Sequence, residues 1–175
     1  AIMAGGGCGA LVRTEDEWRA SPQGIAAAAE PPVTLTRIGD APPRPLPQAD
    51  RPLHGVRVLD LTRVLAGPTC AKTLAEHGAD VLRISRRDLP NSGVLDLDTS
   101  VGKRSAWLDL RDPPQRQTML DLVRGCDVFS QAYRPGALDR HGLSAEALAA
   151  LRPGIVYVCL NAWGYGSPWR ERRGF

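Results

Sequence analysis

The chain has 175 residues, of which 43% are hydrophobic, and this is enough for one ordinary domain with a core of its own. Its net charge is +3, and the sequence lacks the dense interleaving of basic and aromatic residues that a nucleic-acid surface requires. No stretch approaches the roughly 20 apolar residues of a membrane span, and no charged start leads into an apolar signal core. We therefore expect neither nucleic-acid binding, nor membrane insertion, nor export.

Cysteine and histidine usage argues against disulfides and metal sites. The four cysteines lie far apart and form no CxxC pair: Cys8, Cys70, Cys126 and Cys159. Three of them fall in apolar segments, so we expect reduced, buried thiols in a cytoplasmic protein. The histidines lack the i, i+4 spacing of helical metal ligands: His54, His77 and His141. We therefore predict no metal.

The first predicted element is a short helix. Thr14, with Glu17 three residues later, forms a capping box that begins it. Pro22 and Gly24 interrupt this helix, and the alanine run over 26–29 is expected to add another turn.

A short strand and a proline-rich linker are expected next. The strand is predicted from three alternating residues: Val33, Leu35 and Arg37. Five prolines within a dozen residues then predict a semi-rigid, extended segment: Pro42, Pro43, Pro45, Pro47 and Pro52. We therefore place the main boundary at a linker over 41–53, with a first segment over 1–40 and a second domain over 54–175.

Residues 55–84 predict a strand, a helix and a second strand. The first strand is apolar enough to be buried on both faces: Val56, Val58, Leu59 and Leu61. Pro68 suits the first position of a helix that runs to His77, and Gly78 suits a left-handed closing residue. The second strand covers 79–84. A right-handed βαβ crossover is the expected arrangement.

The same alternation continues to residue 160. The remaining elements are predicted in this order: a loop over 87–102, a strand over 105–110, a helix over 114–124 closed by Gly125, a strand at Val128 and Phe129, a helix over 144–151 begun by Ser144, and a strand over 155–160. Repeated alternation of strands and helices predicts an α/β fold with a doubly wound, mostly parallel sheet.

Several side chains follow these strands, at the edge where such sheets bind ligands. The first, second and fourth strands are followed by these residues: Val64, Leu65, Arg86, Arg87, Tyr133 and Arg134. Lys103 and Arg104 precede the third strand, so they reach this edge only if their loop folds back over it. A single loop arginine is usually a solvated surface charge, but the convergence of several basic residues at one edge of the sheet favours an anionic, nucleotide-like ligand. No GxGxxG or P-loop motif is present, which excludes the ordinary dinucleotide and P-loop sites.

Residues 52–175 contain ordered motifs that together resemble one family. The motifs are VLDLTRVLAGP, LAEHGADVLRI, GKRSAWLDL, RPGALDRHGL and PGIVYVCLNAWGYGSP. They resemble the N-terminal half of the family III CoA-transferases (CaiB/BaiF type). The resemblance implies a large Rossmann-like domain that holds coenzyme A, a smaller domain, and an interlocked homodimer that acts on an acyl-CoA and a carboxylic acid.

The resemblance also implies where CoA is held. Val64 and Leu65 match residues near its pantetheine and adenine path. Positions that meet its phosphates or lie beside them are matched by Arg86, Lys103, Arg104 and Arg140. Tyr133 and Ala137 match the loop that covers the nucleotide. The chain departs from the family pattern at two positions: Ser85, where an acidic residue is common, and Ala132, where an asparagine is common.

Residues 1–40 resemble a different part of the family. The segment CGALVRTEDEWRASPQG is similar to one that lies in the small domain, after the large domain, in ordinary members. Its position ahead of the large domain suggests a fused or rearranged member that carries two family halves in tandem.

The resemblance implies an aspartate nucleophile that attacks the acyl-CoA thioester. In the family pattern this aspartate follows the WGYGSP loop by about the length of WRERRGF, which places it directly after Phe175. We therefore expect no catalytic residue within this chain, which we interpret as a piece of a longer protein that is inactive alone.

Two alternatives stay open. The first is an enzyme like α-methylacyl-CoA racemase, which needs a histidine in the helix before the fifth strand, where Ala149 stands here. The second is a non-catalytic module in which the half-family fold binds CoA or serves as an assembly surface.

Overall fold

The computed structural model describes residues 2–90 and 92–174, which form two compact units. The first, here called the sheet unit, contains residues 37–132 and 138–160. The second, the terminal unit, contains residues 2–36, 133–137 and 161–174. The placement of the linker and of the domain boundary at 41–53 stays a prediction.

The sheet unit confirms the predicted α/β fold. Among the described residues, five parallel strands form one sheet in the order β3-β2-β1-β4-β5. The strands are β1 (Arg57–Leu61), β2 (Asp80–Ser85), β3 (Lys103–Trp107), β4 (Val128–Gln131) and β5 (Val156–Cys159). The chain moves outward from β1 to β3 and then returns to β4 beside β1. The order therefore reverses between β1 and β4, where ligands bind in such sheets.

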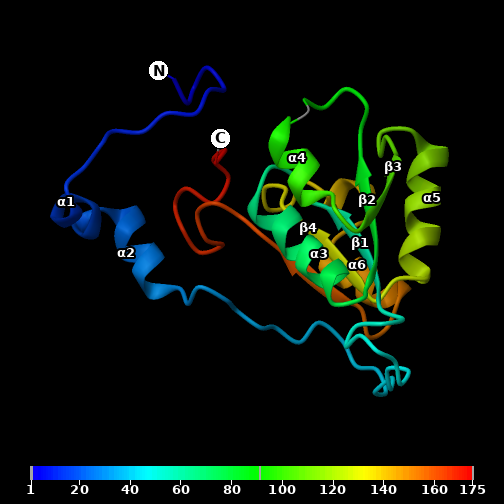
Figure 1. The fold of residues 1–175 in the computed structure, drawn as a ribbon. Coiled ribbons are helices and arrows are strands. Elements are labelled where there is room, and N and C mark those ends of the chain that lie inside the picture. Colours follow the sequence, from blue (N-terminus) through cyan, green and yellow to red (C-terminus); the bar gives the residue numbers. More distant parts are fainter. Residues whose placement is uncertain (1, 91, 175) are drawn as a thin grey trace. The chain divides into compact units, whose positions relative to one another are not determined.

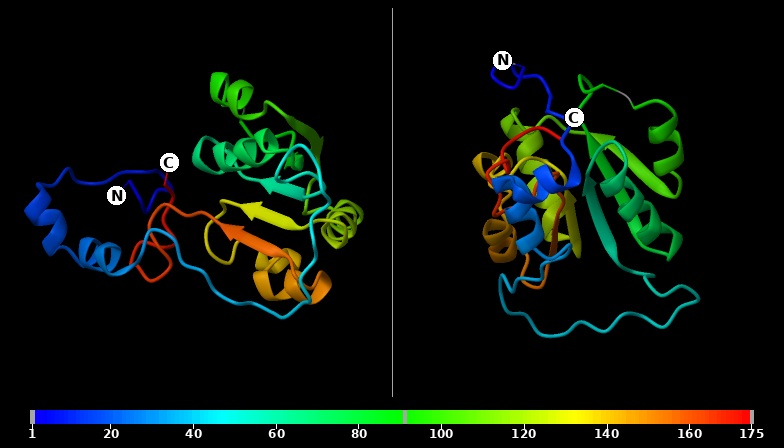
Figure 2. Two further views of the ribbon diagram at one scale, coloured as in Figure 1. Left: turned by 60° about the horizontal axis from the view of Figure 1, so that its bottom comes forward. Right: turned by 90° about the vertical axis from the view of Figure 1, so that its left-hand side faces the viewer.

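Helices cover both faces of the sheet, as Figures 1 and 2 show. Helices α3 (Ala66–Glu76) and α4 (Val94–Thr99) lie on one face, and α5 (Pro113–Arg124) and α6 (Ala145–Leu151) lie on the other. The layer under α3 is built from small and β-branched side chains: Val56, Val58, Ala71, Ala75 and Val81. Elsewhere the largest fully buried side chain is Phe129, whose burial contributes about 1.5–3 kcal/mol.

Helix α3 begins two residues earlier than the sequence predicts. Pro68 occupies the third helical position and not the first, but it still lies in the first turn, where no backbone N–H has an intrahelical partner. The predicted left-handed closing residue is confirmed: Gly78 has φ +100°. Its N–H donates to Ala75 O (2.9 Å) and Ala79 N–H donates to Leu74 O (3.0 Å), the two bonds of a Schellman motif.

The segment between β2 and α5 differs most from the sequence prediction. Strand β3 covers Lys103–Trp107 and not 105–110, because its ladder with β2 begins where Lys103 pairs with Val81. Helix α4 lies within the predicted loop over 87–102. Its N-cap, Gly93, offers no side-chain hydrogen bond, so the sequence carries no start signal. Instead, Asp96 of α4 forms a half-buried ion pair with Arg83 of β2 (3.0 Å).

The terminal unit contains α1 (Glu15–Ala20) and α2 (Pro22–Ala29). The predicted capping box of Thr14 and Glu17 is present at α1. Pro22 does not merely interrupt that helix: it begins α2, whose N-cap is Ser21, and Gly24 lies within α2. The predicted strand over 33–37 is wrong, because these residues form neither helix nor strand.

Burial of the cysteines was largely mispredicted. The described cysteines are all free, but Cys8, Cys70 and Cys159 are exposed. Cys70 lies on an exposed position of α3 and Cys159 on the edge strand β5, so an apolar neighbourhood in sequence did not bury them. Only Cys126 is buried, and burial, aided by nearby Asp127, raises the pKa of its thiol to about 12.

None of the helices in residues 2–90 and 92–174 has the length and apolar character that a membrane crossing requires.

The close approach of α3 to the end of β1 is testable. A Cβ at Gly67 would lie 2.4 Å from Cβ of buried Thr62, so we expect Gly67→Ala to lower the free energy of unfolding by about 1–3 kcal/mol, despite alanine's better helix propensity. Gly125→Ala is the matched control, because its Cβ would meet nothing closer than 3.7 Å. Urea denaturation checks both variants, and equal stability of the two would contradict the close packing.

Candidate functional site

The loop from β1 to α3 lies at the carboxyl end of β1, where the strand order reverses. Val64 in this loop has φ +72°, a rare conformation for a β-branched residue and one that the surrounding structure must enforce. Leu65 is the N-cap of α3 and is 52% exposed. The first intrahelical bond runs from Thr69 N to Leu65 O (2.8 Å), so the N–H groups of Ala66 and Gly67 precede the ladder. A helix end of this kind favours anionic groups.

A buried ion pair lies beneath this loop. Lys103 Nζ of β3 donates to Asp60 Oδ2 of β1 (2.8 Å) and to the Pro68 carbonyl oxygen in the first turn of α3 (2.8 Å). Both charged side chains have zero exposure to solvent. Asp60 Oδ1 accepts from the Thr62 backbone N–H (3.0 Å) and from the Thr62 hydroxyl. One carboxylate thus joins β1, β3 and the loop, and the lysine extends this network to α3.

Charged groups also gather where β2 and β3 end. Arg86 forms an ion pair with Asp88, and Asp88 lies 3.5 Å from Nη2 of Arg111. Arg111 also binds Asp109 through its side chain and its backbone N–H. Arg63, on the loop after β1, donates to the Pro90 carbonyl oxygen (2.8 Å) and so joins that loop to the one after β2. The arginines at this edge are therefore partly neutralised by carboxylates.

Four of the predicted site residues lie on the carboxyl side of the sheet. Val64 and Leu65 follow β1, Arg86 follows β2, and Arg140 lies in the short 3-10 helix η1 (Asp139–His141) after β4. Arg140 Nε lies 3.2 Å from Nε2 of His141. Burial and the positive charge of Arg140 lower the pKa of that histidine.

Lys103 and Arg104 are not in the loop before β3, where the sequence predicted them. They are the first two residues of the strand, at the opposite end from the carboxyl edge. The ammonium group of Lys103 is enclosed by its contacts with Asp60 and Pro68. The guanidinium group of Arg104 binds both carboxylate oxygens of Asp80 at the start of β2 (2.6 Å each). Neither group lies free at the carboxyl edge.

Tyr133 and Ala137 belong to the terminal unit, and the other predicted site residues belong to the sheet unit.

The sequence interpretation missed the ion pair of Asp60 with Lys103. One signal could have found it: an aspartate inside a strand that is otherwise apolar on both faces needs a buried cation. Among the described residues, no group of three His, Cys, Asp or Glu side chains is placed to hold a metal ion.

Comparison with known proteins assigns the greater part of the chain to a family. Residues 53–175 match the model of CoA-transferase family III. The chain belongs to this family. A crystal structure of a CaiB/BaiF family protein from Brucella suis has 30% sequence identity and a TM-score of 0.67, over 73% of this chain and 38% of the other. The Rossmann-like parallel sheet is therefore that of the CoA-transferase family.

Two curated relatives extend the comparison. The acetyl-coenzyme A transferase nodX of Hypoxylon pulicicidum is 40% identical over 129 residues, which cover 71% of this chain and 22% of the relative. An acyl-CoA transferase of Gibberella moniliformis is 32% identical over 184 residues, which cover 99% of this chain and 32% of the relative. The second alignment includes residues ahead of the family match. The chain spans about a third or less of these two relatives.

The buried ion pair makes a stability prediction. Lys103→Met leaves the Asp60 carboxylate buried without its cation, so we expect the free energy of unfolding to fall by about 3–5 kcal/mol in urea denaturation. Arg104→Met breaks an exposed pair and is expected to cost about 1 kcal/mol or less. Adding Asp60→Asn to Lys103→Met removes the unpaired charge and is expected to restore part of the loss. Equal stability of the two single variants would refute the structural role of the pair.

The pair of Asp109 and Arg111 makes a pH prediction. Hydrogen bonds from the Arg111 side chain and backbone lower the pKa of Asp109 from 3.8 to about 2. Because the pKa is depressed in the folded protein, the stabilisation is present above pH 3.8 and is lost as the pH falls toward 2. We expect an NMR titration midpoint near 2 for the Asp109 carboxyl, and a midpoint closer to 3.8 in Arg111→Gln. Arg124→Gln should leave the Asp109 midpoint unchanged, and a midpoint near 3.8 in the unaltered chain would disprove the interaction.

Proposed function

We propose that the protein moves CoA between an acyl-CoA and a carboxylic acid, and that the carboxyl edge of the sheet unit holds the CoA. One observation carries the proposal: residues 53–175 match CoA-transferase family III, and within them a strained loop and a helix N-terminus lie where the strand order reverses. Open parallel sheets bind their ligands at that point.

The groups at this edge suit the parts of CoA. Val64 and Leu65 offer apolar side chains for the pantetheine and adenine path, and Leu65 is half exposed. Arg86 and Arg140 offer planar guanidinium groups, which bind phosphate oxygens in pairs. We propose that Arg86 and Arg140 bind the phosphates of CoA, and that Arg86 exchanges its ion pair with Asp88 for one with the ligand. Tyr133 and Ala137 are proposed to cover the nucleotide.

We assign Lys103 a supporting role in place of a phosphate contact. Its ammonium group is fully enclosed and bonded to Asp60 and Pro68, so it shapes the loop that carries Val64 and Leu65. A contact between Arg104 and CoA stays a prediction, and it requires Arg104 to leave Asp80.

The proposed chemistry is covalent. An aspartate carboxylate attacks the thioester carbonyl of the acyl-CoA, which forms a mixed anhydride and releases the CoA thiolate. The thiolate attacks the aspartyl carbonyl of the anhydride, which gives an aspartyl-CoA thioester and frees the first acid. A second carboxylate then attacks the aspartyl-CoA thioester, which forms a second mixed anhydride and expels the CoA thiolate. The thiolate attacks the acyl carbonyl of the second acid in this anhydride, which gives the new acyl-CoA and frees the aspartate carboxylate. We place the nucleophile directly after Phe175.

Two aspartates within the sheet unit are poor candidates for the nucleophile. Asp60 is buried and bonded to Lys103, and Asp109 is bonded to Arg111, so each carboxylate already has a cationic partner. The interlocked homodimer and the cytoplasmic location stay predictions.

A covalent adduct tests the proposed function. In a longer protein that continues past Phe175, incubation with acetyl-CoA, succinyl-CoA or formyl-CoA is expected to leave CoA bound to the residue after Phe175, detected by mass spectrometry of the peptide. Alanine at that residue is expected to abolish the adduct and CoA transfer. The chain of residues 1–175 is expected to bind CoA weakly or not at all and to transfer none. Robust transfer by this chain alone would overturn the assignment of the nucleophile.

A further inference from the structure

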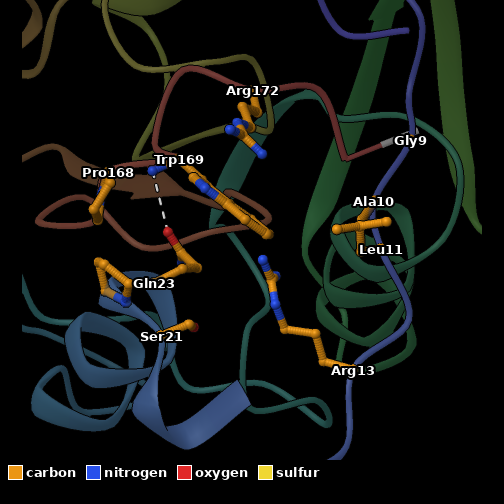
Figure 3. A pocket seen from close by; sticks show the side chains of 10 residues that line it. Gly9, Ala10, Leu11, Arg13, Ser21, Gln23, Pro168, Trp169 and Arg172 are labelled. Atoms are coloured by element: carbon orange, nitrogen blue, oxygen red, sulfur yellow. Dashed lines mark hydrogen bonds between the residues drawn. The ribbon is translucent and has the colours of Figure 1, made fainter. Parts of the chain in front are cut away.

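The terminal unit contains a cavity of about 440 Å³ that the proposed CoA site does not use. It is lined by the segment before α1, the start of α2 and the segment over 168–172, as Figure 3 shows. This volume falls within the range of small-molecule sites in proteins.

Hydrogen bonds between distant parts of the chain hold its walls. The buried side chain of Gln23 donates to the Trp163 carbonyl oxygen (3.1 Å) and accepts from the Trp169 backbone N–H (3.1 Å). The Glu30 carboxylate accepts from the backbone N–H groups of Tyr165 (3.2 Å) and Gly166. The Trp169 ring also meets the Trp163 ring edge to face, with centroids 5.1 Å apart. These contacts join the α2 wall of the cavity to the wall over 168–172, while the third wall is the exposed segment over 9–13.

One part of the wall is apolar and another is positively charged. Leu11, Pro168 and Trp169 supply apolar surface. The Arg172 guanidinium lies 4.2 Å from the centre of the Trp169 ring, and Arg13 points into the cavity toward that ring in Figure 3.

Neither cavity arginine forms an ion pair within the described part of the chain, although the charge of Arg13 helps to lower the pKa of nearby Glu17. The ion pairs of the terminal unit that the structure describes are Arg19 with Glu15 and Arg170 with Glu171. Arg13 and Arg172 thus offer hydrogen-bond donors beside an aromatic wall. A guanidinium group in such a place is suited to a carboxylate, and the ring is suited to an apolar body attached to it.

We propose that this cavity binds the carboxylic acid of the transfer reaction, as a monocarboxylate with an apolar body. The proposal rests on the proposed function and adds the class of acid. The carboxylate lies at the guanidinium groups of Arg13 and Arg172, and the body lies against Leu11, Pro168 and Trp169. An inorganic anion would leave the apolar wall unused, and a second carboxylate on the body would lose its water against that wall.

Phenylacetate tests the proposal on the chain of residues 1–175. We expect saturable binding, seen by calorimetry and by a change in tryptophan fluorescence. Phenylacetamide, its neutral analogue of the same shape, and glutarate, a dicarboxylate, are each expected to bind at least about tenfold more weakly, since hydrogen bonds to charged groups are the stronger ones. Equal affinity for acid and amide, tighter binding of glutarate, or no saturable binding of phenylacetate would overturn the proposal.

Arginine variants locate the bound acid. Arg13→Gln and Arg172→Gln are expected to weaken phenylacetate binding about tenfold, and Arg172→Lys to weaken it less because the charge remains. Arg170→Gln is the matched control, because Arg170 is a neighbouring arginine outside the cavity lining, and it should bind within about twofold of the unaltered chain. Circular dichroism checks that each variant folds. Unchanged affinity in both Arg13→Gln and Arg172→Gln would show that the acid binds elsewhere.

A longer, active protein separates this proposal from the proposed function. There, Arg13→Gln and Arg172→Gln should raise KM for phenylacetate and leave the affinity for CoA unchanged. CoA transfer by these variants with an unchanged KM would show that the acid does not bind in the cavity, while the proposed CoA-transferase activity would stand. Phenylacetate binding by a protein that transfers no CoA would support the cavity as an acid site and would overturn the proposed activity.

Discussion

The buried ion pair between Lys103 and Asp60 is the interaction on which the rest of the sheet unit depends. Two charges without any exposure to solvent require mutual pairing and further hydrogen bonds, which Thr62 and the Pro68 carbonyl supply. Because these four residues come from β1, its loop, α3 and β3, their bonds fix the loop at the point where strand order reverses. The strained backbone of Val64 is held within this frame.

The family resemblance and the structure indicate different roles for Lys103. The resemblance implies a basic residue at or beside the CoA phosphates, whereas the structure encloses its ammonium group beneath the loop. An enclosed lysine still serves the ligand if it orders the backbone that the ligand meets. In the proposed site the phosphates are then bound by arginines on the loops after β2 and β4, of which Arg86 forms an ion pair with Asp88.

The elements that the sequence predicted well carry local signals. Apolar runs marked β1 and β2, Thr14 and Ser144 marked helix starts, and Gly78 marked a helix end. Helix α4 and the start of β3 have no such signals, because a tertiary ion pair with Arg83 and a ladder with β2 define them. Of the site, the positions of the loops after the strands were predicted, but the burial of Lys103 depends on contacts 35 and 43 residues away in sequence.

Hydrogen exchange tests most directly whether the carboxyl edge holds CoA. In a longer protein that binds CoA, we expect CoA to slow the exchange of backbone amides in residues 62–67 and in the loop after β2. Protection confined to the start of β3, at the opposite end of the sheet, with unchanged exchange in residues 62–67, would contradict this placement of CoA.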